Sequence, residues 1–326
     1  MNKKKHIVVL ATGGTIAGAG EAGKATDYAP GSISIQTLLD GVESLKRVAE
    51  VTGIQVVNVN SDDITGDIWI DLARRINRMA MDPAVDGFVI THGTDTLEET
   101  AYFLHLTVKT EKPVVITGSM RPSTAISADG PMNMLQAVSV AACDDARGKG
   151  VLCVFSDAIY GARNVQKVSM TSVTAFDNRD LGMLGCIVDG HVIFYNQPAR
   201  EHTVRSVFEV EQIDHLPKVE IISFYTDADP ELLRFAGRNA DGLVIAGAGN
   251  GNYSRLFHQA VGEMGIPVVR SSRISGGVIT PDSAFDEWGN IIRSDNLPPT
   301  KAKILLQLAL TRTNDIELMQ KFFTVY

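Results

Sequence analysis

Cysteine is scarce in this chain of 326 residues, and the few cysteines follow no metal-binding or disulfide pattern. Cys143, Cys153 and Cys186 are an odd number, stand in apolar surroundings and form no CxxC pair. Such spacing disfavours both a disulfide framework and a zinc site. We therefore expect three buried thiols and no bound metal.

Long hydrophobic runs and an excess of positive charge are also missing. No apolar stretch approaches the ~18 residues that a membrane-spanning helix needs, and the formal net charge of −8 disfavours polyanionic partners. Residues 3–5 are lysines, but the apolar run after them reaches Gly13 too early for a signal peptide. We expect a cytoplasmic protein that binds neither nucleic acid nor membrane. A periplasmic or secreted form whose signal peptide was removed is the alternative.

The chain does contain a regular alternation of apolar strands and helical segments. Strands are expected at residues 7–10, 55–60, 88–90, 113–117 and 151–155, and helices at 67–81, 96–109 and 129–146. This alternation is typical of a mostly parallel sheet covered by helices on both faces. Three further strands, at 218–224, 242–246 and 266–270, follow a segment without periodicity.

The sequence therefore predicts two α/β domains. The larger N-terminal domain, residues 1–195, has a mostly parallel sheet flanked by helices. Residues 196–216 form a linker, and residues 217–326 form a smaller C-terminal domain with a parallel sheet.

Two of the predicted strands are each followed by a threonine beyond their carboxyl ends. Residues 7–10 lead to Gly13 and Gly14, where the chain can turn sharply, and Thr15 follows. Residues 88–90 lead to Thr94. Ligands of parallel α/β sheets bind beyond the carboxyl ends of the strands. Both hydroxyls are thus candidates for a reactive site, although each threonine taken alone fits an ordinary loop residue.

The segment after the second of these strands also predicts a helix start. Thr96 with Glu99 has the spacing of a capping box, so a helix begins near Thr96. The positive end of that helix then faces Thr94 and Asp95. A carboxylate and a developing oxyanion are both stabilised there.

The motifs ATGGTI at residues 11–16 and THGTDT at 91–96 resemble the two signatures of the bacterial-type L-asparaginases. The likeness continues through GSMRP at 118–122, SADGP at 127–131, GNGN at 249–252 and VRSSR at 269–273, so it covers nearly the whole chain. It implies hydrolysis of L-asparagine to L-aspartate and ammonia through a threonine ester, without a cofactor. It also implies a homotetramer built as a dimer of dimers. A glutaminase-asparaginase of broad amide preference, which would also take L-glutamine, is the alternative within this class.

The resemblance assigns catalytic roles. Thr15 matches the nucleophile, and Tyr28 matches the tyrosine of a loop that closes over the substrate. A threonine hydroxyl needs a nearby proton acceptor, and Thr94, Lys167 and Asp95 match the family's second triad, in which a lysine beside a carboxylate relays protons. Whether Thr94 serves the first step or activates water stays open. A packing role for Tyr28 and a surface position for Lys167 are the alternatives.

The resemblance also assigns substrate-binding residues. Ser61 matches the serine that binds the substrate carboxylate, and Asp62, where many relatives carry Gln or Glu, joins Asp95 as a partner for the ammonium group. Ser119 lies in a shared motif and is assigned to the same pocket. Asn250 matches a residue contributed by a second subunit, which implies sites shared between chains.

One departure from the family pattern concerns a glutamate that several relatives supply from a neighbouring subunit. Ala284 stands at that position, and Asp282, Asp286 and Glu287 are the candidates to replace it. The departure motivates a second class of function, an amino-acid-binding or regulatory protein without turnover.

Two other motifs are not assigned catalytic roles. His92 is expected to be structural, because no GxSxG elbow accompanies it. Residues 18–23 match GxGxxG but lack the strand–turn–helix context of a dinucleotide site.

Overall fold

The computed structural model describes residues 4–20, 28–29, 34–178 and 180–326. The chain divides into two compact units, Met1–Ser206 and Val207–Tyr326, and the division falls inside the segment 196–216. Each unit is described by itself. Among the described residues, no helix has both the length and the apolar character to cross a membrane.

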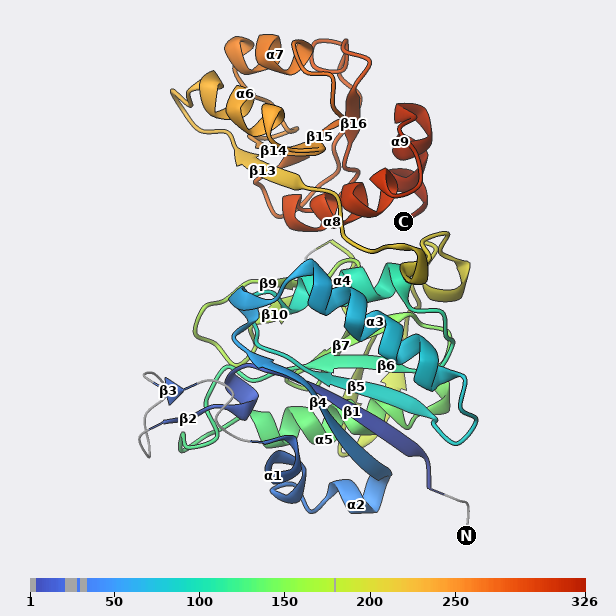
Figure 1. Cartoon of the computed structure of the whole chain (residues 1–326). Coiled ribbons are helices and arrows are strands. Elements are labelled where there is room, and N and C mark those ends of the chain that lie inside the picture. Colours follow the sequence, from blue (N-terminus) through green and yellow to red (C-terminus); the bar gives the residue numbers. More distant parts are fainter. Residues whose placement is uncertain (1–3, 21–27, 30–33, 179) are drawn as a thin grey trace. The chain divides into compact units, whose positions relative to one another are not determined.

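An eight-stranded sheet forms the centre of the first unit (Figure 1). Its order is β12-β11-β8-β7-β6-β5-β1-β4; the five strands from β7 to β4 pair in parallel, and β8, β11 and β12 pair antiparallel. The strands are β1 (His6–Gly13), β4 (Glu50–Val59), β5 (Gly87–Thr91), β6 (Val114–Thr117), β7 (Val151–Phe155), β8 (Ala158–Gly161), β11 (Gly185–Val188) and β12 (His191–Phe194). Every residue of β5, β6 and β7 is buried, as continuous apolar runs in a covered parallel sheet require.

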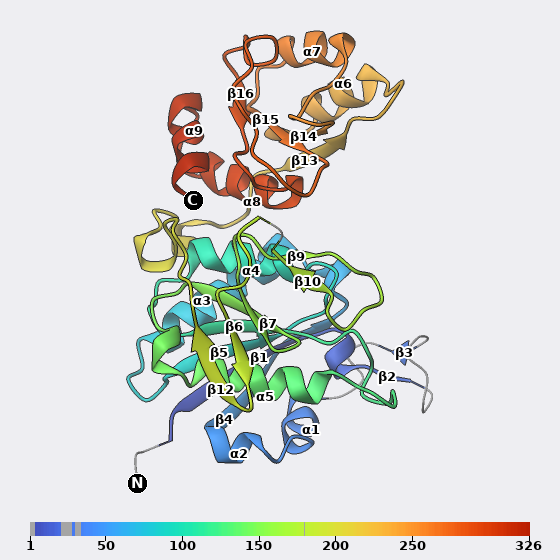
Figure 2. The same cartoon turned by 180° about the vertical axis from the view of Figure 1, so that it is seen from behind.

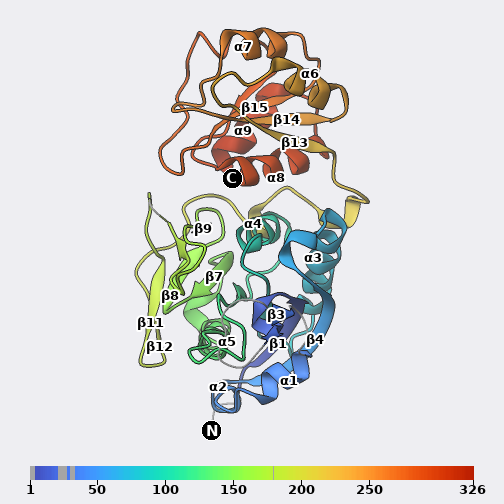
Figure 3. The ribbon, with the colours of Figure 1, turned by 90° about the vertical axis from the view of Figure 1, so that its left-hand side faces the viewer.

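Helices cover both faces of this sheet. One face carries α3 (Gly66–Ala80) and α4 (Leu97–Thr107), and the other carries α1 (Ile35–Asp40), α2 (Leu45–Val48) and α5 (Gly130–Ala141) (Figure 3). Two-stranded sheets join β2 (Ala19–Gly20) to β3 (Tyr28–Ala29) and β9 (Gln166–Lys167) to β10 (Phe176–Asp177).

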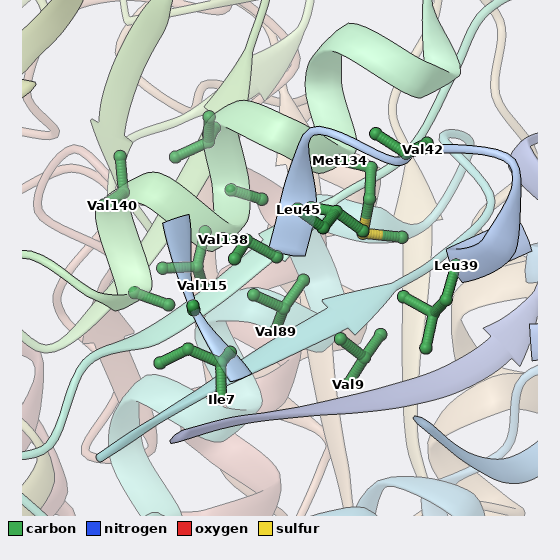
Figure 4. Close-up of a cluster of buried hydrophobic side chains, with 14 of the residues drawn as sticks. Ile7, Val9, Leu39, Val42, Leu45, Val89, Val115, Met134, Val138 and Val140 are labelled. Atoms are coloured by element: carbon green, nitrogen blue, oxygen red, sulfur yellow. The ribbon is translucent and has the colours of Figure 1, made fainter. Parts of the chain in front are cut away.

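Alternate residues of each central strand face opposite layers. Ile7 and Val9 of β1 pack with Val89, Val115 and Met134 in a core shared with α1, α2 and α5 (Figure 4). Because successive strand residues point to opposite faces, the intervening residues of β1 face α3 and α4. Burial on both faces fixes the strand ends that carry the candidate residues.

The second unit has a four-stranded parallel sheet in the order β13-β14-β15-β16. Its strands are β13 (Val219–Ser223), β14 (Gly242–Gly247), β15 (Val268–Ser272) and β16 (Ile291–Arg293), and its helices are α6 (Pro230–Arg238), α7 (Arg255–Gly262), α8 (Pro299–Leu310) and α9 (Ile316–Val325). Helices α6 and α7 lie on one side of the sheet and α8 on the other (Figure 2). The predicted fold class, a larger and a smaller α/β domain with parallel sheets, is confirmed.

Several details differ from the sequence expectations. The strand expected at 55–60 is the longer β4, the helix expected at 129–146 ends at Ala141, and the second unit has four strands instead of three. The short helices α1 and α2 and the hairpin of β11 and β12 were not expected, because their segments show no clear periodicity. Cys143, Cys153 and Cys186 form no disulfide, but only Cys153 of these three is buried, while the other two are half-buried.

Candidate active site

Four neighbouring parallel strands each end at a buried hydroxyl residue. Thr15 follows β1, Ser61 follows β4, Thr94 follows β5 and Ser119 follows β6. Because these strands are adjacent in the sheet and parallel, their carboxyl ends lie along one edge. The structure therefore gathers four of the predicted site residues at the edge where α/β proteins bind ligands.

The loops after β1 and β5 are in direct backbone contact. Gly14 has a φ of +81°, and a Cβ atom there would lie 2.3 Å from the nitrogen of Gly93. Only glycine meets both conditions at no steric cost. Thr15 and Thr94 are the residues that follow these two glycines, so the contact holds the two threonine-bearing loops together.

The loop after β4 joins the same cluster. A Cβ atom on Gly93 would lie 2.8 Å from Ser61 Oγ, and the hydroxyl of Thr96 donates a hydrogen bond of 2.6 Å to the Ser61 carbonyl oxygen. The bond that a capping box assigns to the Thr96 side chain is therefore a wrong prediction. Thr96 does occupy the N-cap position of α4, but its side chain makes no cap bond because it is bonded to the β4 loop.

Lys167 reaches this edge from β9. Its Nζ donates to Thr94 Oγ1 at 2.8 Å and forms an ion pair with Asp95 Oδ1 at 2.5 Å. The Lys167 side chain is 17% exposed and that of Asp95 is 70% exposed. The three residues predicted as a relay are therefore in contact, with the threonine on the buried side and the carboxylate on the open side.

His92 forms the interior support of the Thr94 loop. It is fully buried, and burial lowers its pKa to about 4, while the hydrogen bond to Gly93 acts in the opposite direction. Trp69 Nε1 donates to Thr100 Oγ1, which is 2.8 Å from His92 Nε2, while His92 Nδ1 is 2.7 Å from the Gly93 carbonyl oxygen. The indole only donates and the carbonyl only accepts, so the neutral ring carries its proton on Nδ1. This chain of bonds fixes the Gly93 carbonyl.

The loop after β6 is held by Asp129, which precedes α5. Its carboxylate accepts from the backbone nitrogens of Met120 and Arg121, both at 2.9 Å. Ser119 Oγ, in turn, donates to the Arg121 carbonyl oxygen. Asp129 stands at the N-cap position of α5, but its side chain makes no cap bond, because it binds the preceding loop.

Two further predicted residues lie in the first unit without a contact that defines their role. Asp62 is an exposed residue of the turn η2 (Ser61–Asp63), next to Ser61. The backbone of Tyr28 pairs with Gly20 between β3 and β2, and the Tyr28 side chain lies outside the described part of the chain.

Asn250 belongs to the second unit, on the loop between β14 and α7. Its side chain accepts from the Thr280 nitrogen at 2.8 Å. The fully buried Arg270 donates to the Asn250 carbonyl oxygen at 2.6 Å and pairs with Asp286. Arg270 thus holds the Asn250 loop against the segment that contains Ala284.

The three acids considered as replacements for the family glutamate have partners within the second unit. Asp286 pairs with Arg270 and also with Arg293. Asp282 Oδ1 accepts from the Ala284 nitrogen, and Glu287 lies 2.5 Å from His258 Nε2. Each of these three carboxylates therefore binds a partner within the second unit.

Three residues that support the site through hydrogen bonds were not predicted from the sequence. Glu98 Oε2 accepts from the Lys167 backbone nitrogen at 2.5 Å, and Trp69 and Thr100 support His92. A glutamate in the first turn of a helix is normally explained by the helix dipole. A contact across 69 residues has no sequence signal of its own.

Comparison with known proteins identifies the family of this chain. A family model described as "Asparaginase, N-terminal" matches residues 6–200, and one described as "Glutaminase/Asparaginase C-terminal domain" matches residues 218–323. The chain is 46% identical to L-asparaginase 2 of Bacillus subtilis (strain 168) over 326 residues, covering 98% of this chain and 86% of that protein. It is 41% identical to a glutaminase-asparaginase of Pseudomonas fluorescens biotype A, covering 99% of this chain and 91% of that protein.

A solved structure shares the fold over the whole length. The crystal structure of a probable cytoplasmic L-asparaginase from Campylobacter jejuni superposes with a TM-score of 0.96 at 40% identity, covering 99% of this chain and all of that one. The two family matches together span most of the chain and include every strand of both main sheets. This chain belongs to the asparaginase family of amidohydrolases.

Proposed function

We propose that this protein hydrolyses the side-chain amide of L-asparagine to L-aspartate and ammonia, with Thr15 as the nucleophile. The observation that carries the proposal is the contact of Lys167 Nζ with both Thr94 Oγ1 and Asp95 Oδ1, on a loop whose Gly93 abuts Gly14. A hydroxyl, a cationic proton carrier and a carboxylate thereby meet beside the Thr15 loop. Acyl transfer to a threonine needs such a proton path.

The reaction proceeds in two steps. The Thr15 oxygen attacks the carboxamide carbon, and its hydroxyl proton passes to the relay described below. The C–N bond then breaks as the leaving nitrogen takes up a proton. Water then attacks the ester carbon, the C–O bond to Thr15 breaks, and the hydroxyl regains its proton. Thr94, Lys167 and Asp95 form the relay that moves these protons.

The remaining predicted residues are proposed to hold the substrate. Ser61 donates to its α-carboxylate, and Asp62 and Asp95 face its ammonium group. The burial of Ser61 beside Gly93 and the exposure of both acids support this division, since a carboxylate on the open side attracts the cation while it stays hydrated. Ser119 shapes the pocket from the β6 loop, Asn250 contributes from a second subunit, and Tyr28 is assigned to the reaction by resemblance alone.

Ammonia release tests the proposal. Wild type is expected to release ammonia from asparagine, and Thr15→Ala and Thr94→Val are expected to reduce kcat by about 10³-fold or more. Thr107→Val is a matched control, since it removes a buried hydroxyl at the far end of α4, where that group donates to the Phe103 carbonyl oxygen of the same helix. Equal loss of ammonia release in all three variants would show general damage and contradict the assignment.

Two alternatives are separated by the same assay. A glutaminase-asparaginase would show similar kcat/KM for both amides, whereas an asparaginase could prefer asparagine by about 10- to 200-fold, because one methylene in a pocket changes discrimination by about 1–3 kcal/mol. The sequence similarity to a glutaminase-asparaginase favours testing both substrates. An amino-acid-binding protein without turnover would bind asparagine and release no ammonia in wild type as well as in the variants.

We propose a homotetramer, with residues 196–216 as the linker between the two domains. The gap between the two family matches, residues 201–217, supports the linker, and light scattering tests the assembly. We propose a cytoplasmic location from the likeness to the Campylobacter jejuni protein. Cell fractionation with a periplasmic marker tests it.

A further inference from the structure

Three residues of the segment 94–98 bind Lys167, two at its ammonium group and one at its backbone nitrogen. Thr94 Oγ1 and Asp95 Oδ1 bind its Nζ at 2.8 and 2.5 Å. Glu98 Oε2, in the first turn of α4, accepts from its backbone nitrogen at 2.5 Å. The ammonium group and the backbone of the same lysine are thus fixed to residues only four positions apart.

Further backbone hydrogen bonds around Lys167 are local: the Val165 nitrogen donates to the Gly161 carbonyl oxygen, and the Val168 nitrogen donates to the Ala175 carbonyl oxygen. Strand β9 is two residues long and pairs with β10 in a sheet separate from the eight-stranded one. A lysine side chain has about 2 kcal/mol of rotamer entropy, so a firmly placed backbone is needed to hold its ammonium group at one spot. Within the described parts of the first unit, Glu98 is the acidic side chain that ties this backbone to α4.

A carboxylate suits this place for two reasons. A charged acceptor makes a shorter and stronger hydrogen bond to a backbone N–H than a neutral acceptor does. The first turn of a helix also stabilises negative charge. Glu98 is part-buried, and its bond spans two segments far apart in the sequence, so the bond joins α4 to β9 and does not cap the helix.

We propose that Glu98 is a positioning residue for amide hydrolysis, which acts by fixing the backbone of Lys167 so that Nζ stays on Thr94. The inference rests on the proposed function, in which Lys167 relays the proton of Thr94. Glu98 acts through Lys167 and not through contact with the substrate. Its loss should therefore slow the chemical step and leave substrate affinity nearly unchanged.

A double-mutant cycle on the full-length protein tests this role. Glu98→Ala is expected to lower kcat for asparagine by about 10- to 100-fold with KM within about twofold, since a displacement of about 1 Å at a catalytic group has such effects. Glu98→Gln keeps an oxygen acceptor and should recover most of kcat. In a Lys167→Met background, Glu98→Ala should cause no further loss, because the residue through which it acts is gone.

A matched control removes the same charge from the same turn. Glu99→Ala is expected to keep wild-type kcat, because Glu98 is the residue bonded to Lys167. A similar loss of kcat in Glu99→Ala, or an equal further loss from Glu98→Ala in the Lys167→Met background, would overturn the proposal. So would an unchanged kcat in Glu98→Ala with a lowered Tm.

The outcomes also separate this role from the proposed function. Wild-type kcat in Lys167→Met would contradict the relay itself, and the role of Glu98 would fall with it. A large loss in Lys167→Met with no loss in Glu98→Ala would contradict the role of Glu98 alone.

Discussion

Gly14 and Gly93 lie backbone against backbone, so closely that a Cβ atom on Gly14 would come within 2.3 Å of the Gly93 nitrogen. The contact links the ends of β1 and β5, which are neighbours in the sheet. Each glycine is followed directly by a threonine of the proposed mechanism. The two threonine-bearing loops can therefore approach this closely because neither glycine carries a side chain.

Gly14→Ala tests this contact. The positive φ and the clash together should lower the free energy of unfolding by about 2–5 kcal/mol and reduce asparagine hydrolysis. Gly190→Ala is the matched control, since Gly190 has a φ of +78° and nothing within 4 Å of its added Cβ. It should cost about 1–2 kcal/mol and leave kcat unchanged. Equal costs in urea unfolding would show that the contact contributes nothing.

Lys167→Met tests the relay. Methionine keeps much of the apolar stem but removes the ammonium group that binds Thr94 and Asp95. We expect kcat to fall by about 10²- to 10⁴-fold, the usual contribution of a positioned acid–base group. Lys112→Met, which removes an ammonium group bound to the Asp82 carbonyl oxygen on the surface, should retain activity. Steady-state kinetics of both variants give the answer, and similar kcat values in the two would rule out the relay.

His92 should make the protein less stable in mild acid. Its pKa is about 4 in the folded protein, against an ordinary value of 6.5 for a solvated histidine, so the unfolded chain binds the proton more strongly. The contribution of this group to stability is full above pH 6.5 and is lost as the pH falls toward 4. The loss amounts to about 2 kcal/mol between about pH 7 and pH 5.

The test for His92 is the difference between two pH profiles. Urea unfolding of wild type and His92→Gln at about pH 7, 6 and 5 should show a shallower loss of stability in the variant. His202 has a pKa lowered to about 4, chiefly by burial, and contributes to both proteins alike, so the difference isolates His92. Parallel profiles would mean that His92 is not buried in its neutral form.

The second unit offers an independent test. Arg270→Met leaves the Asp286 carboxylate without its buried guanidinium partner and should cost about 3–5 kcal/mol. Arg234→Met breaks surface pairs with Glu231 and Glu263 and should have little effect. Thermal unfolding compares the two. A Tm for Arg270→Met as high as that of Arg234→Met would contradict a supporting role under the Asn250 loop.

The sequence predicted the strands well because burial imposes a simple pattern. Strands β5 and β7 are covered on both faces and appear as unbroken apolar runs. The two glycine–threonine turns were found for the same reason, since each lies where such a run stops. Helices α1 and α2 have six and four residues, too few for a periodicity to show.

The predictions that failed concern side chains with a choice of partners. The Thr96 hydroxyl could bond to its own helix or to Ser61, and the structure has the second bond. Asp129 binds the loop before α5 in the same way. Lys167 was found by resemblance and not by pattern, since β9 is too short to predict, and Glu98 depends entirely on where β9 lies. Sequence patterns describe hydrogen bonds between neighbouring residues. They cannot show when a side chain instead bonds to a residue that only the fold brings close.

Trapping the covalent intermediate is the most direct test of Thr15 as the nucleophile. Wild type and Thr15→Ala are each mixed with asparagine and quenched in acid during the first turnover, and peptide mass spectrometry then measures the segment that contains Thr15. We expect an added aspartyl group on Thr15 in wild type and none on that segment of Thr15→Ala. An aspartyl group on another residue, or wild-type ammonia release from Thr15→Ala, would contradict this role of Thr15.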